Sequence, residues 1–408
     1  MSSRPAFSRR FPWEQPQNRL TRAVEERATR GLPTIDLTET NPTRVGLPYP
    51  EAELADLLRR GAAASYQPDP RGLLPAREAL AGYLSAARPE DLPVSPDDLL
   101  LTASTSESYS YLFKLFADPG DQVLAPVPSY PLLDSLAALD GLDLAHFPLK
   151  WRGRFAVDLD TVELALSPRT RLLALVHPGH PTGSFLTVRE LEEMGVLCAS
   201  RGLPLLSDEV FADYPLDSGG GGEHRAGPAA AGFGEGLTFS LGGLSKSAGL
   251  PGWKLGWIRV GGPAGLRRRA LAALEMVADS YLSLATPVQQ ALPGVLALAP
   301  AIRGALLDRL RGNLSRLREA VAGVPGVELF EPEGGWSAVL RVTSRSSDEE
   351  LVLGLLESTG ILVQPGYFYD FVTDDFLVLS LLPAPDRFAL GVGRLAGFLG
   401  ERSGENGL

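Results

Sequence analysis

The most informative stretch of this chain reads Ser240-Leu-Gly-Gly-Leu-Ser-Lys-Ser-Ala-Gly-Leu-Pro-Gly-Trp-Lys-Leu-Gly-Trp257. It holds two of the four lysines of the chain, and the other two are Lys114 and Lys150. A lysine amine can form a Schiff base with a carbonyl group, which an arginine cannot do, and a second cation nearby can hold an anionic group. Lys246 and Lys254 therefore either belong to a cofactor site or are two surface lysines on a glycine-rich loop.

Length and composition exclude several classes of protein. With 408 residues, of which 44% are hydrophobic and 21% charged, the chain is long enough for one large and one smaller domain. Its net charge of −11 argues against a nucleic-acid surface. The N-terminus lacks the apolar core of a signal peptide, and no apolar run is long enough to span a bilayer, so we expect a cytoplasmic protein without a membrane partner. A single cysteine, and histidines without ligand spacing, predict no metal site.

Apolar strand patterns alternate with helical patterns between residues 97 and 260. Such alternation predicts a three-layer αβα domain around a mostly parallel sheet. The later part of the chain favours long helices and short strands, including two helices at residues 287–298 and 302–321 and one strand at residues 361–364. This order is typical of a smaller α+β domain.

These patterns divide the chain into three parts. Residues 1–45 are predicted to form an N-terminal arm, with a helix at residues 18–30, and part of the small domain. Residues 46–295 form the large, cofactor-binding domain, and residues 296–408 form the C-terminal small domain. The glycine-rich residues 215–236 predict a mobile insertion.

Four chemically distinct groups follow predicted strands of the large domain. They are Ser104, residues 177–183, Asp208, and the pair Ser245 and Lys246. Ligands of such sheets bind beyond the carboxyl ends of the strands, so we expect these groups to meet at one edge.

Pyridoxal 5′-phosphate (PLP) matches the chemistry of this set. Lys246 can hold its aldehyde, and Asp208 can keep its pyridine nitrogen protonated. The phosphate can bind at the helix N-terminus that begins at Ser104, and Tyr130 can stack on the ring. Each residue also has an ordinary structural interpretation: Asp208 as a strand-end acid, Ser104 as a helix cap within a capping box with Glu107, and Tyr130 as a packing residue.

The order of these segments resembles that of the class I and II aminotransferases, fold type I PLP enzymes typified by aspartate aminotransferase. The resemblance extends from about Ile35 to the end of the chain. The matching segments are Tyr66 with Gly72 and Arg77, residues 102–107, 119–123, 128–131, 181–183, 207–210, 245–247, 249–256 and 364–366.

The resemblance implies a PLP-dependent enzyme that transfers an amino group from a small-molecule amino donor to a carbonyl acceptor, such as a 2-oxo acid. Lys246 would be the Schiff-base lysine and catalytic base, and Asp208 the partner of the pyridine nitrogen. Tyr66 would reach the phosphate of the neighbouring subunit in a homodimer with shared active sites. The other cofactor-binding residues would be Ser104, Thr105, Ser106, Tyr130, His180, Ser245 and Lys254.

The chain departs from the family pattern at four positions. His180 replaces an asparagine, Phe211 a tyrosine and Lys254 an arginine. Val378 stands where the family has the arginine that binds the substrate α-carboxylate.

Either another cation takes over this role or the substrate lacks an α-carboxylate. The polar turn that contains Thr40, Asn41 and Arg44 is the candidate substrate segment, with Arg44 as the candidate cation. Two other functions stay open: a PLP-dependent lyase or decarboxylase on the same fold, and a PLP-binding regulator or catalytically idle relative.

Overall fold

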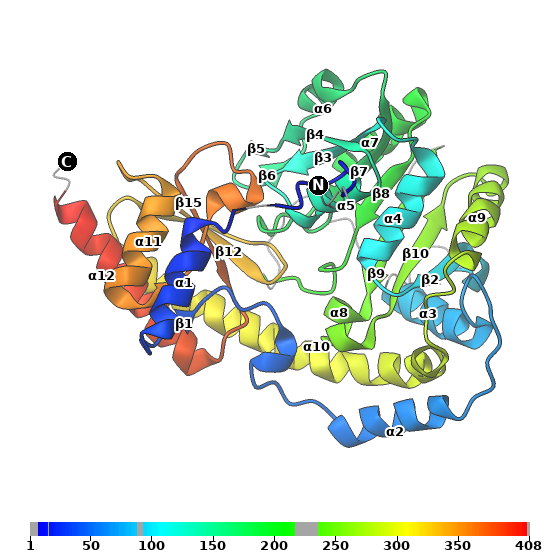
Figure 1. Ribbon diagram of the computed structural model, residues 1–408, viewed down its shortest axis with the longest axis horizontal. Coiled ribbons are helices and arrows are strands. Elements are labelled where there is room, and N and C mark those ends of the chain that lie inside the picture. Colours follow the sequence, from blue (N-terminus) through cyan, green and yellow to red (C-terminus); the bar gives the residue numbers. More distant parts are fainter. Residues whose placement is uncertain (1–6, 15, 88–92, 217–235, 406–408) are drawn as a thin grey trace, which may run out of the picture.

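A seven-stranded sheet forms the centre of the larger part of the molecule (Figure 1). The computed structural model describes residues 7–14, 16–87, 93–216 and 236–405. All neighbouring strands of the sheet run parallel except β10, which is antiparallel to both of its neighbours. The predicted mostly parallel sheet is therefore confirmed. In spatial order the strands are β2 (Leu99–Thr102), β10 (Gly256–Gly261), β9 (Thr238–Gly243), β8 (Leu205–Asp208), β7 (Thr170–Val176), β3 (Gln122–Val127) and β4 (Asp143–Pro148).

Helices cover both faces of this sheet, because its strands are apolar on both sides. Leu172 and Ala174 of β7 belong to the same hydrophobic core as residues of α4 (Thr105–Phe116), α5 (Leu132–Leu139) and α9 (Ala264–Asp279). Leu173 and Leu175 point to the opposite face and pack with residues of α6 (Leu159–Ala165) and α7 (Val188–Arg201). The result is the predicted arrangement of three layers.

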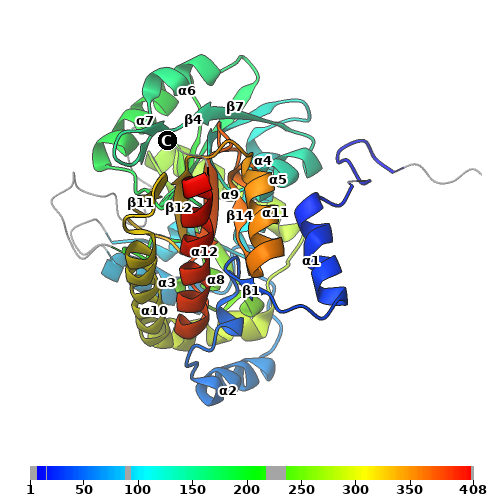
Figure 2. The ribbon, with the colours of Figure 1, turned by 90° about the vertical axis from the view of Figure 1, so that its left-hand side faces the viewer.

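A four-stranded antiparallel sheet forms the smaller part of the molecule. Its order is β11 (Val327–Phe330), β12 (Ser337–Val342), β15 (Phe376–Ser380) and β14 (Gln364–Pro365). The helices α1 (Arg19–Thr29), α11 (Asp348–Thr359) and α12 (Pro385–Glu405) lie on this part of the molecule (Figure 2). The predicted helix of the arm is thus confirmed as α1.

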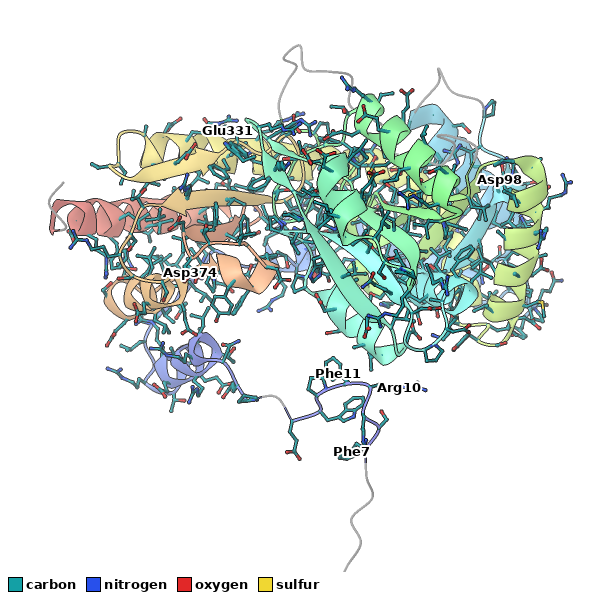
Figure 3. All side chains as sticks on the ribbon, turned by 90° about the horizontal axis from the view of Figure 1, so that it is seen from above. Phe7, Arg10, Phe11, Asp98, Glu331 and Asp374 are labelled. Carbon is teal, nitrogen blue, oxygen red and sulfur yellow. The ribbon has the colours of Figure 1, made fainter. Side chains whose placement is uncertain are left out.

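The strand predicted at residues 361–364 is in fact two short strands in different sheets. β13 (Ile361–Leu362) pairs in parallel with β1 (Ile35–Asp36), whereas β14 joins the antiparallel sheet. The pairing of β1 with β13 attaches the N-terminal arm to the smaller part. Residues 7–14 extend away from the body, as the labelled Phe7 and Phe11 show in Figure 3.

One long helix, α10 (Thr286–Val321), connects the two parts, and the prediction of two helices was wrong. Pro293 and Pro300 lie inside it. Each proline removes one backbone hydrogen bond, and packing along the helix compensates for that loss. The first half of α10 packs against α2 (Glu51–Ala62) and α3 (Leu74–Ala87), and the second half packs in the core of the smaller part.

The predicted division at residue 295 falls within α10 and stays a prediction. Among the described residues, this helix is also the only one that is long and apolar enough to cross a membrane. A helix that packs into two hydrophobic cores, as α10 does, needs a similarly apolar composition. The predicted glycine-rich insertion falls mostly on residues 217–235, outside the described residues.

Candidate active site

A cavity of about 150 Å³ lies at the carboxyl ends of the parallel strands, where β12 of the smaller sheet approaches the larger one. The large domain contributes the ends of β7, β8 and β9 and the start of α4. Its lining consists of Thr40, Ser104, Thr105, Tyr130, Val176, His180, Asp208, Val210, Phe211, Gly243, Ser245, Lys246, Leu255, Trp336 and Ser337. The expected convergence of Ser104, His180, Asp208, Ser245 and Lys246 is therefore observed.

Lys246 enters the cavity from α8 (Leu244–Ser247), the short helix that follows β9. Its Nζ lies 4.6 Å from the ring centre of Trp336 and 5.3 Å from that of Phe211. Burial lowers the pKa of this amine to about 8, although the charge of Asp208 opposes that shift. An amine with a lowered pKa is more often neutral at physiological pH, and only a neutral amine is a nucleophile.

Asp208 ends β8 and is buried beneath the cavity. Burial raises its pKa to about 6. Its Oδ2 accepts a hydrogen bond of 2.9 Å from the hydroxyl of Tyr109, and its Oδ1 accepts one of 3.2 Å from the N–H of Val210. Both bonds favour the ionised carboxylate and so limit the rise.

His180 is surrounded by aromatic rings on the cavity wall. Its ring centre lies 5.7 Å from that of Tyr130, 5.4 Å from that of Phe211 and 5.5 Å from that of Tyr369. Burial lowers the pKa of the imidazole to about 3, with a smaller contribution from the charge of Lys246. His180 is therefore neutral and can donate a hydrogen bond from one ring nitrogen only.

The N-terminus of α4 meets the cavity at Ser104 and Thr105. Ser104 is the predicted helix cap, since its Oγ accepts the N–H of Glu107 at 3.2 Å. The predicted capping box is incomplete, because the carboxylate of Glu107 accepts the N–H of Ala103 at 2.6 Å instead of that of Ser104. The free N–H groups of this first turn suit an anion such as a phosphate.

Several residues predicted for the cofactor lie outside the cavity lining. Ser106 is half-buried in the first turn of α4, and Lys254 is exposed in a left-handed backbone conformation with φ of 50°. Tyr66 is 67% exposed and borders a separate shallow pocket together with Tyr111.

The candidate substrate residues are also divided. Thr40 lines the cavity, whereas Asn41 caps a short 3₁₀ helix with its side chain. Arg44 is exposed and pairs with Glu39 at 3.4 Å, so the structure does not bring it to the cavity. Val378 is buried in a cluster of aromatic residues beside the cavity.

Sequence reasoning missed several residues of the site, including Tyr109, Trp336 and Ser337. No sequence signal pointed to Tyr109, which lies inside α4, and Trp336 and Ser337 come from the smaller part of the molecule. Two glycines precede Trp336, but that signal alone indicates no more than a turn.

The residues of the cavity fit PLP. An amine, a buried carboxylate that faces the same cavity, and a helix N-terminus with hydroxyl groups are the chemical partners that its aldehyde, pyridine nitrogen and phosphate require. Together with the αβα architecture, this set defines a PLP enzyme of fold type I.

The chain belongs to the class I and II aminotransferases, because the family model of that description matches residues 39–384. It is therefore a PLP-dependent aminotransferase.

Two relatives and one solved structure illustrate this similarity. Over 375 residues the chain is 26% identical to the glutamate-pyruvate aminotransferase AlaA of Escherichia coli, an alignment that covers 90% of this chain and 91% of that protein. It is 29% identical to an alanine aminotransferase of Mycobacterium bovis, over 90% of this chain and 85% of that protein. The alanine aminotransferase structure from Pyrococcus furiosus superposes with a TM-score of 0.85 at 22% identity, over 94% of this chain and 96% of that one, and so supports the fold.

Proposed function

We propose that the cavity holds PLP through Lys246 and Asp208, and that this site transfers an amino group from a small-molecule amine to a carbonyl acceptor. The observation that carries the assignment is the presence of both side chains on one cavity, at the ends of neighbouring elements. The cofactor, when bound, supplies an electron sink for the carbon that bears the amine.

Each residue of the proposed site would have a role that suits its chemistry. Lys246 would hold the aldehyde carbon, and once displaced by the donor amine it would move a proton from the donor carbon, as its lowered pKa suits. Asp208, supported by Tyr109, would keep the pyridine nitrogen protonated, because a paired cation favours the ionised carboxylate. His180 would donate to the phenolic oxygen of the ring, and Tyr130 would lie over its face.

The phosphate would be held mainly at the N-terminus of α4. Ser104, Thr105 and Ser106 supply backbone N–H groups and hydroxyls there, and Ser245 adds a hydroxyl from α8. Lys254 would serve as a more distant cation.

Tyr66, exposed on its own subunit, would reach the phosphate of a second subunit, which makes the active form a homodimer with shared sites. We place the enzyme in the cytoplasm, in keeping with a composition that is ordinary for a globular protein and with its proposed small-molecule substrates.

Replacement of Lys246 tests the assignment. Lys246→Ala should abolish amino-group transfer and the absorbance of the Schiff base between the protein and PLP, whereas Lys114→Ala, a change at an exposed lysine of α4, should retain both. Transfer activity that survives in Lys246→Ala would refute the assignment.

A further inference from the structure

The charge of the cavity restricts its substrate. Among the described residues that line it, Lys246 is the only side chain with a positive charge, and Asp208 is the only one with a negative charge. His180 is neutral, since burial lowers its pKa to about 3. In the proposed function Lys246 is committed to the cofactor, whose phosphate brings additional negative charge. A substrate carboxylate would therefore enter a cavity that offers it no free cation from these residues.

Apolar side chains surround position 378. Val378 is paired with Val339 on β12 and with Gln364 on β14, and it is 2% exposed. The cluster around it is apolar and mostly aromatic, and comprises Phe155, Phe330, Val339, Tyr369, Phe371, Phe376 and Val378.

This cluster meets the cavity wall at one residue. Tyr369 belongs to it and also contacts His180 on the cavity wall, while its hydroxyl bonds to Gln364. Phe371 and Phe376 stack with ring centres 4.3 Å apart. The cluster therefore offers no charged side chain to the cavity.

Arg44 does not supply the missing charge. It pairs with Glu39 on the exposed turn, and the neighbouring Thr40 reaches the cavity instead. Thr40 and Ser337 offer neutral hydrogen-bonding groups on this side. An ionised carboxylate placed among neutral groups loses its hydration without a compensating ion pair.

We propose that the donor substrate is a primary amine whose reacting carbon carries no ionised carboxylate, with an apolar or aromatic side chain. This inference rests on the proposed function and specifies its substrate class. The aromatic walls formed by Phe211 and Trp336 favour the side chain, and neutral groups such as Thr40 suit an amide or no acyl group at all. The carbonyl acceptor occupies the same cavity, so aldehydes are expected to react in preference to 2-oxo acids.

Equilibrium binding tests the charge preference without turnover. PLP-loaded protein is titrated calorimetrically with 3-phenylpropanamide and with 3-phenylpropanoate, which have no amine and differ only in the charged group. The amide should bind at least about tenfold more tightly, because it has no unpaired charge to desolvate. Equal or tighter binding of the carboxylate would overturn the proposal, whichever subunit supplies the cation.

Arg44→Ala tests the alternative cation in the same experiment. The preference for the amide should be the same in this variant. Weaker binding of 3-phenylpropanoate to Arg44→Ala would mean that Arg44 holds the carboxylate, and the proposal would be wrong.

Half-reactions separate a failure of this inference from a failure of the proposed function. The conversion of bound PLP to its aminated form is followed with three matched pairs: 2-phenylethylamine and L-phenylalanine, ethylamine and L-alanine, and 3-methylbutylamine and L-leucine. At least one amine should react about tenfold or more faster than its amino acid. Faster reaction of the amino acid in every pair would overturn the substrate class and leave the aminotransferase intact, whereas no reaction with any donor would refute the proposed function.

Discussion

The hydrogen bond between Tyr109 and Asp208 links a residue that no sequence signal identified to the centre of the site. Tyr109→Phe removes the hydroxyl that donates to Oδ2 at 2.9 Å and should raise the pKa of Asp208 further. We expect kcat/KM to fall roughly tenfold and the free energy of unfolding to fall by about 1–3 kcal/mol, as for other buried groups that lose a partner. Steady-state kinetics over a pH series and denaturant unfolding measure both effects.

Tyr367→Phe is the matched control, because Tyr367 also donates to a carboxylate, that of Glu349 at 3.2 Å, but on the surface. Its loss should change stability by less than about 1 kcal/mol. If both variants behave alike, the bond to Asp208 has no special role.

The lowered pKa of Lys246 predicts how the stability of the cofactor-free protein depends on pH. The amine titrates at about 8 in the folded chain, against 10.5 for an unperturbed lysine. Between these values unfolding takes up a proton, so stability rises with pH in this window; below pH 8 the full cost of burying the charge is present.

Lys246→Met carries no such charge. It should be more stable than the wild type near pH 7.5 by up to about 3 kcal/mol, and this advantage should shrink toward pH 10.5. Denaturant unfolding at several pH values measures the difference, and a constant difference would contradict the lowered pKa.

How far a site residue could be predicted depended on which element presents it. Lys246, Asp208 and His180 follow strands of one parallel sheet, and chain order suffices to bring them together. Trp336 and Ser337 reach the cavity only because the smaller sheet lies over it, which no local pattern encodes. Arg44 is the opposite case. Its short turn could direct polar side chains either to a cavity or to solvent, and the side chain of Arg44 lies at the exposed surface.

Among the helices, the close approach of α2 to α10 gives a matched pair of glycine substitutions. A Cβ added at Gly61 would lie 2.6 Å from the carbonyl oxygen of Pro287, whereas one added at Gly304 would meet nothing within 4 Å. Gly61→Ala should destabilise the protein by about 1–3 kcal/mol through this clash. Gly304→Ala should stabilise it by about 0.5–1 kcal/mol, since alanine is the better helix former. Thermal or denaturant unfolding distinguishes them, and equal effects would contradict the packing.

The elements of the large sheet were predictable because each strand is a short apolar run bounded by turns. The continuity of α10 could not be predicted from the sequence. Pro293 and Pro300 interrupt its apolar helical pattern, and a proline usually ends a helix. The helix continues because tertiary packing on both cores outweighs the lost backbone bonds.

At the scale of the whole molecule, the proposed homodimer can be tested by mixing two inactive variants. Lys246→Ala lacks the amine, and Tyr66→Ala lacks the residue proposed to serve the neighbouring site. A mixed dimer contains one site with both residues intact, so random re-association should restore roughly a quarter of wild-type activity. Activity that stays at the sum of the separate variants, in a mixture shown by native mass spectrometry to exchange subunits, would contradict shared sites.

The most direct test of the account is the position of the covalent link to PLP. Borohydride reduction of the PLP-loaded protein fixes the cofactor on the lysine that holds it, and peptide mass spectrometry identifies that lysine among the four of the chain. We predict a single labelled peptide that contains Lys246. Label on Lys114, Lys150 or Lys254 instead, or no label at all, would contradict the account.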